Sequence, residues 1–244
     1  MVDQPQKVKE DKKASVESMF DSIAWRYDFL NHFLSFNFDR IWRRQAIKII
    51  SRSFISPSIL DVATGTGDLA IEAMKFNPSR ISGIDISNKM LEIGREKIAQ
   101  KGLEGKIDLI RGDSENIPFN DDFFDVAMVA FGVRNFSDPL KGLTEMKRVI
   151  RTGGMIMVLE FSKPKRFPFK PLYNFYFKSI LPVFGRLFSK DKTAYSYLPD
   201  SVMRFPDNEE FLKLLVQAGF SDQKQVKLTG GVASIYTGFK LQRQ

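Results

Sequence analysis

The chain has 244 residues, of which 43% are hydrophobic, and it carries a formal net charge of +8. This length and apolar content suffice for one well-packed domain, and the absence of cysteine excludes disulfides, thiolate metal sites and a cysteine nucleophile. The lysine-rich first residues lack the apolar core of a signal peptide, and no stretch approaches the roughly 18 apolar residues of a membrane-spanning helix. We therefore expect a globular protein of the cytoplasm.

The N-terminal part of the sequence is expected to precede the main fold. Residues 1–15 are polar and charged, which predicts a flexible segment. Over residues 16–50 apolar side chains recur at helical spacing, which predicts helices that form a lid. Residues 16–244 together are expected to form a single domain.

The middle of the sequence alternates short β-branched runs with longer amphipathic stretches. The runs predict strands at 58–62, 81–86, 107–112, 124–131 and 155–161. Helical patterns lie between them, at 67–76, 88–101 and 138–150. This alternation predicts an α/β fold with a doubly wound, mostly parallel sheet.

The end of the sequence adds one helix and two strands. Residues 211–220 follow a helical pattern, and residues 223–229 and 233–241 are typical of strands, with Gly230 and Gly231 between them. Two strands joined so tightly must run antiparallel. The sheet is therefore expected to have seven strands, with an antiparallel strand at its edge.

A glycine turn follows the first predicted strand, in the stretch ATGTGDLA. Gly65 and Gly67 allow the backbone to turn sharply and bring its N–H groups, and the N-terminus of the next helix, against a ligand. A plain tight turn would also explain both glycines, so this motif alone does not identify a binding site.

Three acidic residues, Asp61, Asp85 and Asp113, stand at the ends of three successive predicted strands. This is the edge at which open α/β sheets bind ligands, and Asp85 has the spacing from Gly65 at which a carboxylate accepts both hydroxyls of a ribose. Each residue alone could be a turn former or a helix cap. Together they predict a nucleoside pocket.

The turn also indicates which kind of nucleoside is bound. A dinucleotide would require a third glycine to seat its pyrophosphate, and the turn, which reads A-T-G-T-G-D, lacks it. Arrayed carboxylates suit a cationic ligand without phosphates, and S-adenosylmethionine is such a ligand.

The sequence resembles two nested groups of enzymes. The stretches DVATGTGDLA, GIDIS, GDSENIPF, FDVAM and VIRTGGMIMVLEF are similar, in order, to the motifs of the class I S-adenosylmethionine-dependent methyltransferases, which have a Rossmann-like fold. The stretches MFDSIAWRYDFLNHFLSFNFDRIWRR, AFGVRNFSD and YSYLPDSVMRFPDNEEF resemble the C-methyltransferases of menaquinone and ubiquinone biosynthesis. The resemblance covers residues 16–240.

This resemblance implies an activity and a set of cofactor contacts. The methyl of S-adenosylmethionine would be transferred to a polyprenyl naphthoquinol, converting demethylmenaquinol to menaquinol, or to the benzoquinol precursor of ubiquinone, or to both. Contacts to the cofactor are implied at Thr66, Asp85, Asp113 and Ser114. Relatives often carry serine where this sequence has Ala130. A non-catalytic S-adenosylmethionine-binding protein and a nucleic-acid methyltransferase are the rival interpretations.

Arg134 and Asn135 follow the fourth predicted strand, at the same edge of the sheet. A guanidinium there can stabilise an oxyanion, and an amide can orient a hydroxyl or a water. The resemblance gives this pair, with Tyr27, a catalytic hydrogen-bonding role. Because the pKa of arginine lies above about 12, we expect anion stabilisation from Arg134 and a water as the proton carrier. A surface salt bridge with a helix cap would also explain the pair.

Other polar residues give weaker signals. His32 is the sole histidine, and its place in an amphipathic helix favours packing or capping over a role as catalytic base. Asp28 and Asn31 are weaker site candidates on the same helical turn. The reaction demands no metal, and the sequence offers no cluster of metal ligands.

A basic aromatic insertion is predicted after the fifth strand, over residues 163–206. Residues 163–190 contain seven basic residues, eight aromatic residues and no acidic residue. This composition suits an interfacial element on an anionic membrane, a greasy channel or a buried helical hairpin. Stacking on single-stranded nucleic acid is disfavoured, because no Asn-Pro-Pro-aromatic motif follows the fourth strand. We therefore expect transient, peripheral binding at the inner face of the membrane and no nucleic-acid partner. The sequence is compatible with a homo-oligomer.

Overall fold

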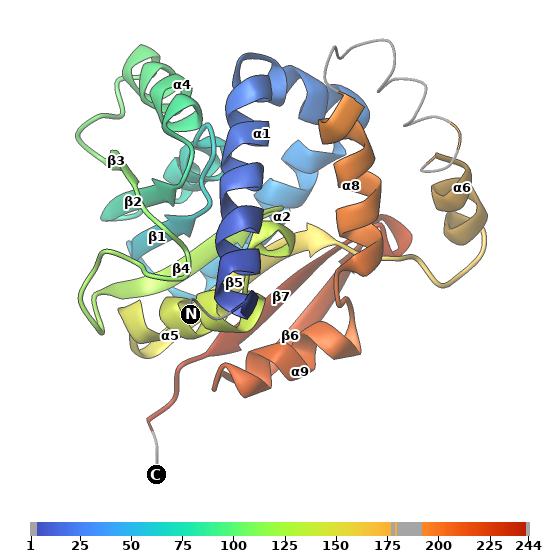
Figure 1. The fold of residues 1–244 in the computed structure, drawn as a ribbon. Coiled ribbons are helices and arrows are strands. Elements are labelled where there is room, and N and C mark those ends of the chain that lie inside the picture. Colours follow the sequence, from blue (N-terminus) through green and yellow to red (C-terminus); the bar gives the residue numbers. More distant parts are fainter. Residues whose placement is uncertain (1–3, 177–178, 180–191, 243–244) are drawn as a thin grey trace.

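The computed structural model describes residues 4–176, 179 and 192–242. In this part of the protein seven strands form one sheet, with helices on both of its faces (Figure 1). The strands are β1 (Ser58–Val62), β2 (Arg80–Asp85), β3 (Ile107–Arg111), β4 (Phe124–Ala130), β5 (Ile150–Phe161), β6 (Ser221–Leu228) and β7 (Ala233–Phe239). Their order across the sheet is β3-β2-β1-β4-β5-β7-β6.

The sheet has the predicted mixed topology. Strands β1 to β5 run parallel, and β7 is antiparallel to both of its neighbours, β5 and β6. The doubly wound, mostly parallel seven-stranded sheet is therefore confirmed, with antiparallel pairing of β7 and β6 at one edge. Strand β5 begins earlier than predicted, because Ile150 already pairs with Phe124 of β4, and a register shift follows before Met155 pairs with Val126.

Helices cover the two faces and create two cores. Helices α2 (Phe38–Ser53), α3 (Asp68–Ala73) and α4 (Asn88–Gln100) pack on one face, and α5 (Pro139–Val149) and α9 (Glu209–Gln217) on the other. Successive residues of β1 alternate between these cores, with Ile59 in the first and Leu60 and Val62 in the second. Burial on both faces leaves the ends of the strands as the place for polar side chains.

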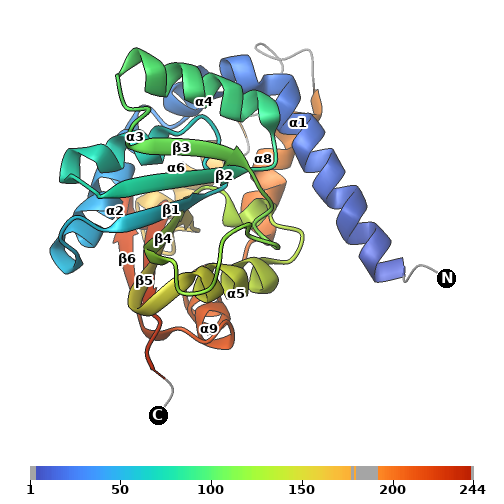
Figure 2. The ribbon, with the colours of Figure 1, turned by 90° about the vertical axis from the view of Figure 1, so that its left-hand side faces the viewer.

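Helix α1 (Gln4–Leu34) lies across the carboxyl ends of the strands, and its N-terminal end projects beyond the sheet (Figures 1 and 2). Asp21 accepts a hydrogen bond from the hydroxyl of Ser87, just after β2, and Glu17 pairs with Arg111 at the end of β3 at 2.7 Å. The described backbone is helical from Gln4, within the segment 1–15 for which flexibility is predicted. Within this segment, Lys12 donates to the carbonyl oxygen of Phe136 and Lys13 pairs with Asp113.

The predicted insertion contributes two described helices, α6 (Phe169–Phe175) and α8 (Lys192–Arg204). The phenol of Tyr176, just after α6, donates to the carbonyl oxygen of Leu34 at 2.7 Å, and α8 runs beside α1 (Figure 1). Residues 177–178 and 180–191 of the predicted basic aromatic segment lie outside the described residues. Within the described ranges, no helix has both the length and the apolar character to cross a membrane.

Gly142 in α5 supports the loop after β4, and we predict that Gly142→Ala destabilises the protein. A Cβ at this position would lie 2.5 Å from the ring of Phe136, which follows Arg134 and Asn135. The overpacking should outweigh the helix propensity of alanine and lower the free energy of unfolding by about 1–2 kcal/mol in denaturant titrations. Gly105→Ala, where a Cβ meets nothing within 4 Å, is the control and should be neutral or slightly stabilising. Equal stability of the two variants would contradict the prediction.

Candidate functional site

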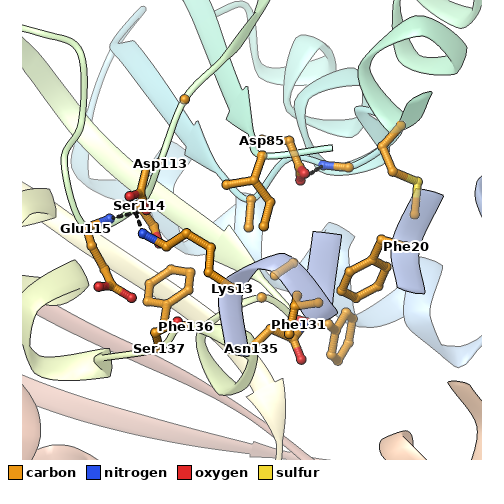
Figure 3. A pocket seen from close by; sticks show the side chains of 18 of the residues that line it. Lys13, Phe20, Asp85, Asp113, Ser114, Glu115, Phe131, Asn135, Phe136 and Ser137 are labelled. Carbon is orange, nitrogen blue, oxygen red and sulfur yellow. Dashed lines mark hydrogen bonds and ion pairs between the residues drawn. The ribbon is translucent and has the colours of Figure 1, made fainter. Parts of the chain in front are cut away.

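A cavity opens at the carboxyl ends of β1 to β4, under α1, and is called here the strand-edge cavity (Figure 3). It holds about 680 Å³ of empty space, its opening included. Its described lining residues are Lys13, Val16, Phe20, Tyr27, Ala63, Gly65, Asp85, Ile86, Met90, Gly112, Asp113, Ser114, Glu115, Ala130, Phe131, Gly132, Asn135, Phe136 and Ser137. Polar groups from four strand ends thus meet apolar side chains from α1 and α4.

Asp85 ends β2 and points into this cavity (Figure 3). One carboxylate oxygen accepts the N–H of Gly65 at 2.9 Å, and the other accepts the N–H of Ser87 at 2.9 Å. Burial nevertheless raises the pKa of this carboxyl from its ordinary value of 3.8 to about 6, and the nearby carboxylate of Asp21 acts in the same direction. A ligand with hydroxyl donors would stabilise the charged form.

A second acidic group lies on the other side of the cavity, just after β3 (Figure 3). Asp113 accepts the N–H of Glu115 at 2.9 Å and forms an ion pair with Lys13 of α1. Ser114 and Phe136 line the cavity beside it. This corner combines hydrogen-bonding groups with an aromatic wall, which suits a flat heterocycle with an amino group.

The glycine turn adopts left-handed backbone conformations. Gly65 has φ +56° and Gly67 has φ +77°. Ala63, where the general methyltransferase turn carries glycine, also has a positive φ, of 52°. A side chain is strained in this region, so the turn is held in place by its surroundings.

The residues predicted to contact the cofactor divide into two groups. Gly65, Asp85, Asp113 and Ser114 line the strand-edge cavity. Asp61, Thr66 and Gly67 are not among its described lining residues. The strand-edge cavity therefore brings together four of the seven, and Asp61 and Thr66 line a smaller pocket that shares Gly65 with it.

Three of the predicted residues serve the turn itself. The buried carboxylate of Asp61 accepts the hydroxyl of Thr64 at 2.6 Å, and burial raises its pKa to about 7. The hydroxyl of Thr66 donates to Asp28 of α1 at 2.6 Å. Gly67 faces the core, since a Cβ there would lie 3.7 Å from Leu109.

A charged cluster fastens α1 to the glycine turn. Its members are Asp28 and His32 of α1, Asp39 and Arg43 of α2, Asp68 of α3 and Lys97 of α4. Lys97 bridges Asp28 and Asp68, and His32 lies 2.7 Å from Asp39. His32 is not among the described residues lining either this cavity or the neighbouring one described below, so its predicted structural role agrees with its position.

A second and larger cavity, called here the aromatic cavity, adjoins the first. It holds about 1320 Å³ of empty space, and it shares Tyr27 and Phe131 with the strand-edge cavity. Its other described lining residues are Asn31, Leu34, Ser35, Phe36, Phe38, Asp39, Trp42, Arg43, Arg134, Phe161, Phe169, Leu172, Tyr173, Tyr176, Thr229 and Val232. This space suits a large aromatic molecule with an apolar tail.

The three predicted catalytic residues lie around the junction of the two cavities. Tyr27 lines both, and burial raises the pKa of its phenol, which also hydrogen-bonds with Asn31. Asn135 lines the strand-edge cavity, and its carbonyl oxygen accepts the phenol of Tyr197 at 3.1 Å. Arg134 lines the aromatic cavity.

Buried groups of the protein fix the guanidinium of Arg134. Its Nη1 donates to Glu160 at 2.7 Å, and its guanidinium lies 5.4 Å from the centre of the Phe161 ring. Glu160 is fully buried, which excludes the alternative of a surface salt bridge. The cap of α5 is Asp138 and not Asn135, so the helix-cap alternative is also wrong.

Residues 6–240 match the ubiE/COQ5 methyltransferase family. The chain belongs to this family. It is 48% identical to the ubiquinone/menaquinone biosynthesis C-methyltransferase UbiE of Geotalea daltonii, over 94% of this chain and 98% of that one, and 46% identical to the demethylmenaquinone methyltransferase of Bacteroides fragilis, over 94% of each. A solved methyltransferase of Aquifex aeolicus shares the fold, with TM-score 0.59 and 20% identity over 80% of this chain and 89% of that one.

Membership in the ubiE/COQ5 family confirms the resemblance drawn from the motifs, and the protein is an S-adenosylmethionine-dependent methyltransferase. The strand-edge cavity fits this cofactor. Its acidic groups suit a cationic nucleoside, and among its described lining residues the one basic side chain, Lys13, is already paired with Asp113. A phosphate-bearing ligand would meet carboxylates with no free cation in that lining to offset them.

Several lining residues were not predicted from the sequence. Lys13 lies in the segment expected to be flexible, and Phe20 lies in the helical lid without any motif of its own. Ile86 and Phe136 each adjoin a predicted site residue and could have been found by extending those motifs. Glu160 lines neither cavity and was not predicted either, although a lone acid inside an apolar strand is a signal visible in the sequence.

The raised pKa of Asp85 predicts a pH-dependent gain in stability for Asp85→Asn without cofactor. In the folded state the Asp85 carboxyl keeps its proton to about pH 6, whereas in the unfolded state its pKa has the ordinary value of 3.8. Ionisation therefore favours the unfolded state, and the carboxyl lowers the free energy of unfolding progressively as pH rises from about 4 to about 7. Between pH 4 and pH 7.5 the stability of the variant relative to the parent should rise by about 1–3 kcal/mol in thermal unfolding, because only the parent loses stability as pH rises. A pH-independent loss is superimposed on this rise, because the amide nitrogen of Asn cannot accept one of the two backbone N–H groups of Gly65 and Ser87. Asp108→Asn, on the exposed side of β3, is the matched surface variant for comparison. A pH-independent difference for Asp85→Asn would refute this account.

Proposed function

We propose that this protein transfers the methyl group to a ring carbon of a polyprenyl naphthoquinol, converting demethylmenaquinol to menaquinol and S-adenosylmethionine to S-adenosylhomocysteine. The observation that carries the proposal is the junction at Tyr27 and Phe131 of an acidic strand-edge cavity with a large aromatic cavity. The name of the Bacteroides fragilis relative supports the naphthoquinol. The name of the Geotalea daltonii relative favours a second candidate, the benzoquinol precursor of ubiquinone.

The strand-edge cavity would hold S-adenosylmethionine, which supplies an activated methyl group when bound. Asp85 would accept the ribose hydroxyls, and its two backbone partners keep it oriented. Asp113 and Ser114 would bind the adenine, with Phe136 as an apolar wall. Asp61, Thr66 and Gly67 would act indirectly, by shaping the turn that presents Gly65.

The aromatic cavity would hold the quinol ring. The Trp42 indole is buried and its N–H donates to Thr229 at 2.9 Å, so its polar atom is satisfied while its ring joins Phe131 and Phe161 in the wall. These rings offer stacking surfaces for a fused bicyclic acceptor. Strict positioning is the main requirement of methyl transfer, because the donor carries its own activation.

Three side chains would stabilise the charge that develops on the acceptor and direct the departing proton: Arg134, Tyr27 and Asn135. A ring carbon becomes nucleophilic when the quinol hydroxyl is deprotonated, and hydrogen-bond donors stabilise the resulting oxyanion. Arg134 supplies a guanidinium, and the raised pKa keeps the Tyr27 phenol protonated as a donor. Asn135 would orient a water that takes the departing proton, with its own carbonyl fixed by Tyr197.

The mouth of the aromatic cavity supports docking at the inner face of an anionic membrane. Four of its lining side chains are also exposed to solvent: Phe36, Phe38, Phe169 and Leu172. We call these four the mouth rim. Exposed basic residues lie on the same segments, namely Arg40, Lys165, Arg166 and Lys170. Apolar rings next to cations suit the interface of a bilayer that contains the polyprenyl substrate.

Labelled S-adenosylmethionine with short-chain demethylmenaquinol should yield labelled menaquinol, and this assay tests the proposed function directly. The demethylated benzoquinol is the second acceptor to be compared. Arg134→Gln should lower kcat roughly 10²–10³-fold, because one oxyanion-stabilising donor is lost. Its affinity for S-adenosylmethionine, measured by calorimetry, should stay within about threefold, because Arg134 lies on the acceptor side.

Arg44→Gln is the matched control for this assay, since Arg44 is 67% exposed and pairs with Glu72 away from both cavities. The control should retain full turnover. Absence of transfer to either quinol would overturn the proposed function, and loss of cofactor affinity in Arg134→Gln would show that Arg134 serves the cofactor instead.

Removing apolar surface from the mouth rim should weaken membrane binding. The double variant Phe36→Ser, Leu172→Ser should sediment with anionic phosphatidylglycerol vesicles at least about tenfold less than the parent, because two exposed apolar side chains no longer enter the interface. Ile55→Ser is the control, because Ile55 is 99% exposed and is not among the described lining residues of the aromatic cavity. Binding of the parent to RNA but not to vesicles would contradict the prediction.

A further inference from the structure

Glu160 is an acidic residue in the most buried part of the sheet. It lies near the end of β5, within the stretch MIMVLEF, and its exposed fraction is 0%. The three residues before it, 157–159, are also fully buried. A carboxylate in such surroundings is unfavourable by several kcal/mol unless its partners compensate the charge.

Among the described residues, the hydrogen-bond partners of Glu160 are Arg134, in the loop after β4, and its own neighbour Phe161. One carboxylate oxygen accepts Nη1 of Arg134 at 2.7 Å and the N–H of Phe161 at 2.9 Å. The other lies 3.4 Å from the backbone nitrogen of Arg134. Glu160 therefore binds both the side chain and the backbone of Arg134. It is not among the described residues that line either cavity.

The contacts with Glu160 fix the direction of the Arg134 guanidinium. Nη1 is shared between Glu160 and the carbonyl oxygen of Phe131, and the group lies over the Phe161 ring. Among the residues that the structure describes, Nε of Arg134 is buried and has no hydrogen-bond partner. Because Nε is enclosed, any contact between the guanidinium and a ligand in the aromatic cavity, which Arg134 lines, must come from the outer nitrogen atoms.

A buried ion pair is weak evidence for a stabilising role, because apolar residues of similar volume often replace such pairs at no loss of stability. The directional contacts between Glu160 and Arg134 indicate a role in positioning instead. We infer that Glu160 is a positioning residue for the methyl transfer: it holds Nη1 and the backbone of Arg134 and so fixes the direction in which the guanidinium faces the oxygen of the aromatic acceptor. This inference rests on the function proposed above.

The ion pair of Glu160 and Arg134 also determines the net charge beside the acceptor. With Glu160 in place the guanidinium is neutralised, so Arg134 acts mainly through a directed hydrogen bond. In Glu160→Gln the guanidinium keeps an uncompensated positive charge but loses its charged anchor. The acceptor hydroxyl should then ionise more readily, while the bond that orients the oxyanion becomes weaker.

The test compares Glu160→Gln with the parent in the quinol assay. We expect kcat to fall roughly 10-fold to 100-fold, with the KM for S-adenosylmethionine unchanged, because a misplaced donor affects only the acceptor. The acidic limb of the kcat–pH profile should move to lower pH by about one unit. Burial raises the pKa values of Tyr27, Tyr173 and Tyr197, the tyrosines near Arg134, so this limb does not report them.

Asp125→Asn is the control for a structural effect. Asp125 is a partly buried carboxylate in β4 at the opposite end of the sheet, where it accepts the N–H of Ser58 at 2.7 Å. This variant should lose stability but keep the kcat and pH profile of the parent. Glu160→Asp, which retains the carboxylate, should restore the position of the acidic limb.

A double-mutant cycle keeps the inference testable if Glu160→Gln folds poorly. Arg134→Gln combined with Glu160→Gln removes both charges, and in the Arg134→Gln background the second substitution should change kcat by less than about twofold. Additive losses, or a Glu160→Gln enzyme with the kcat and pH profile of the parent, would overturn the inference. An inactive parent would instead overturn the proposed function, so the two failures are distinguishable.

Discussion

The burial of carboxylates at the carboxyl edge of the sheet is the constraint on which the site depends. Asp61, Asp85 and Glu160 each lie where solvation is poor, and each is compensated differently. Glu160 has the guanidinium of Arg134, whereas Asp61 and Asp85 have neutral donors and raised pKa values. Of these three carboxylates, only the one on the acceptor side is paired with a cation in direct contact. The cofactor side keeps acidic groups that a cationic nucleoside with hydroxyl donors can stabilise.

Most of the fold could be predicted because parallel strands buried on both faces have a strong sequence signal. The boundaries of β1 agree with the prediction, and β2 to β4 agree to within a residue at each end. The family motifs also located Gly65, Asp85, Asp113 and Ser114 in one cavity, since the topology brings successive strand ends together. Local periodicity and topology were sufficient for these features.

The remaining site residues could not be predicted because their roles depend on side-chain direction. Thr66 belongs to the right motif, yet its hydroxyl turns to Asp28. Lys13 has a polar local sequence, and its order comes from an ion pair with Asp113, far along the sequence. Glu160 was recognisable as a buried acid, but its partner follows a different strand, and only the β4–β5 pairing brings them together. Contacts of this kind follow from tertiary packing.

Helix α1 connects the three parts of the molecule that the reaction needs. Its N-terminal half closes the strand-edge cavity through Lys13 and Phe20, its middle places Tyr27 between the two cavities, and Leu34 at its end lies in the aromatic cavity. The charged cluster around Asp28 ties the same helix to the turn that carries Gly65. Because one helix borders both cavities and leads to the mouth rim, displacing it would open both cavities at once. The strand-edge cavity and the aromatic cavity therefore share a single structural element.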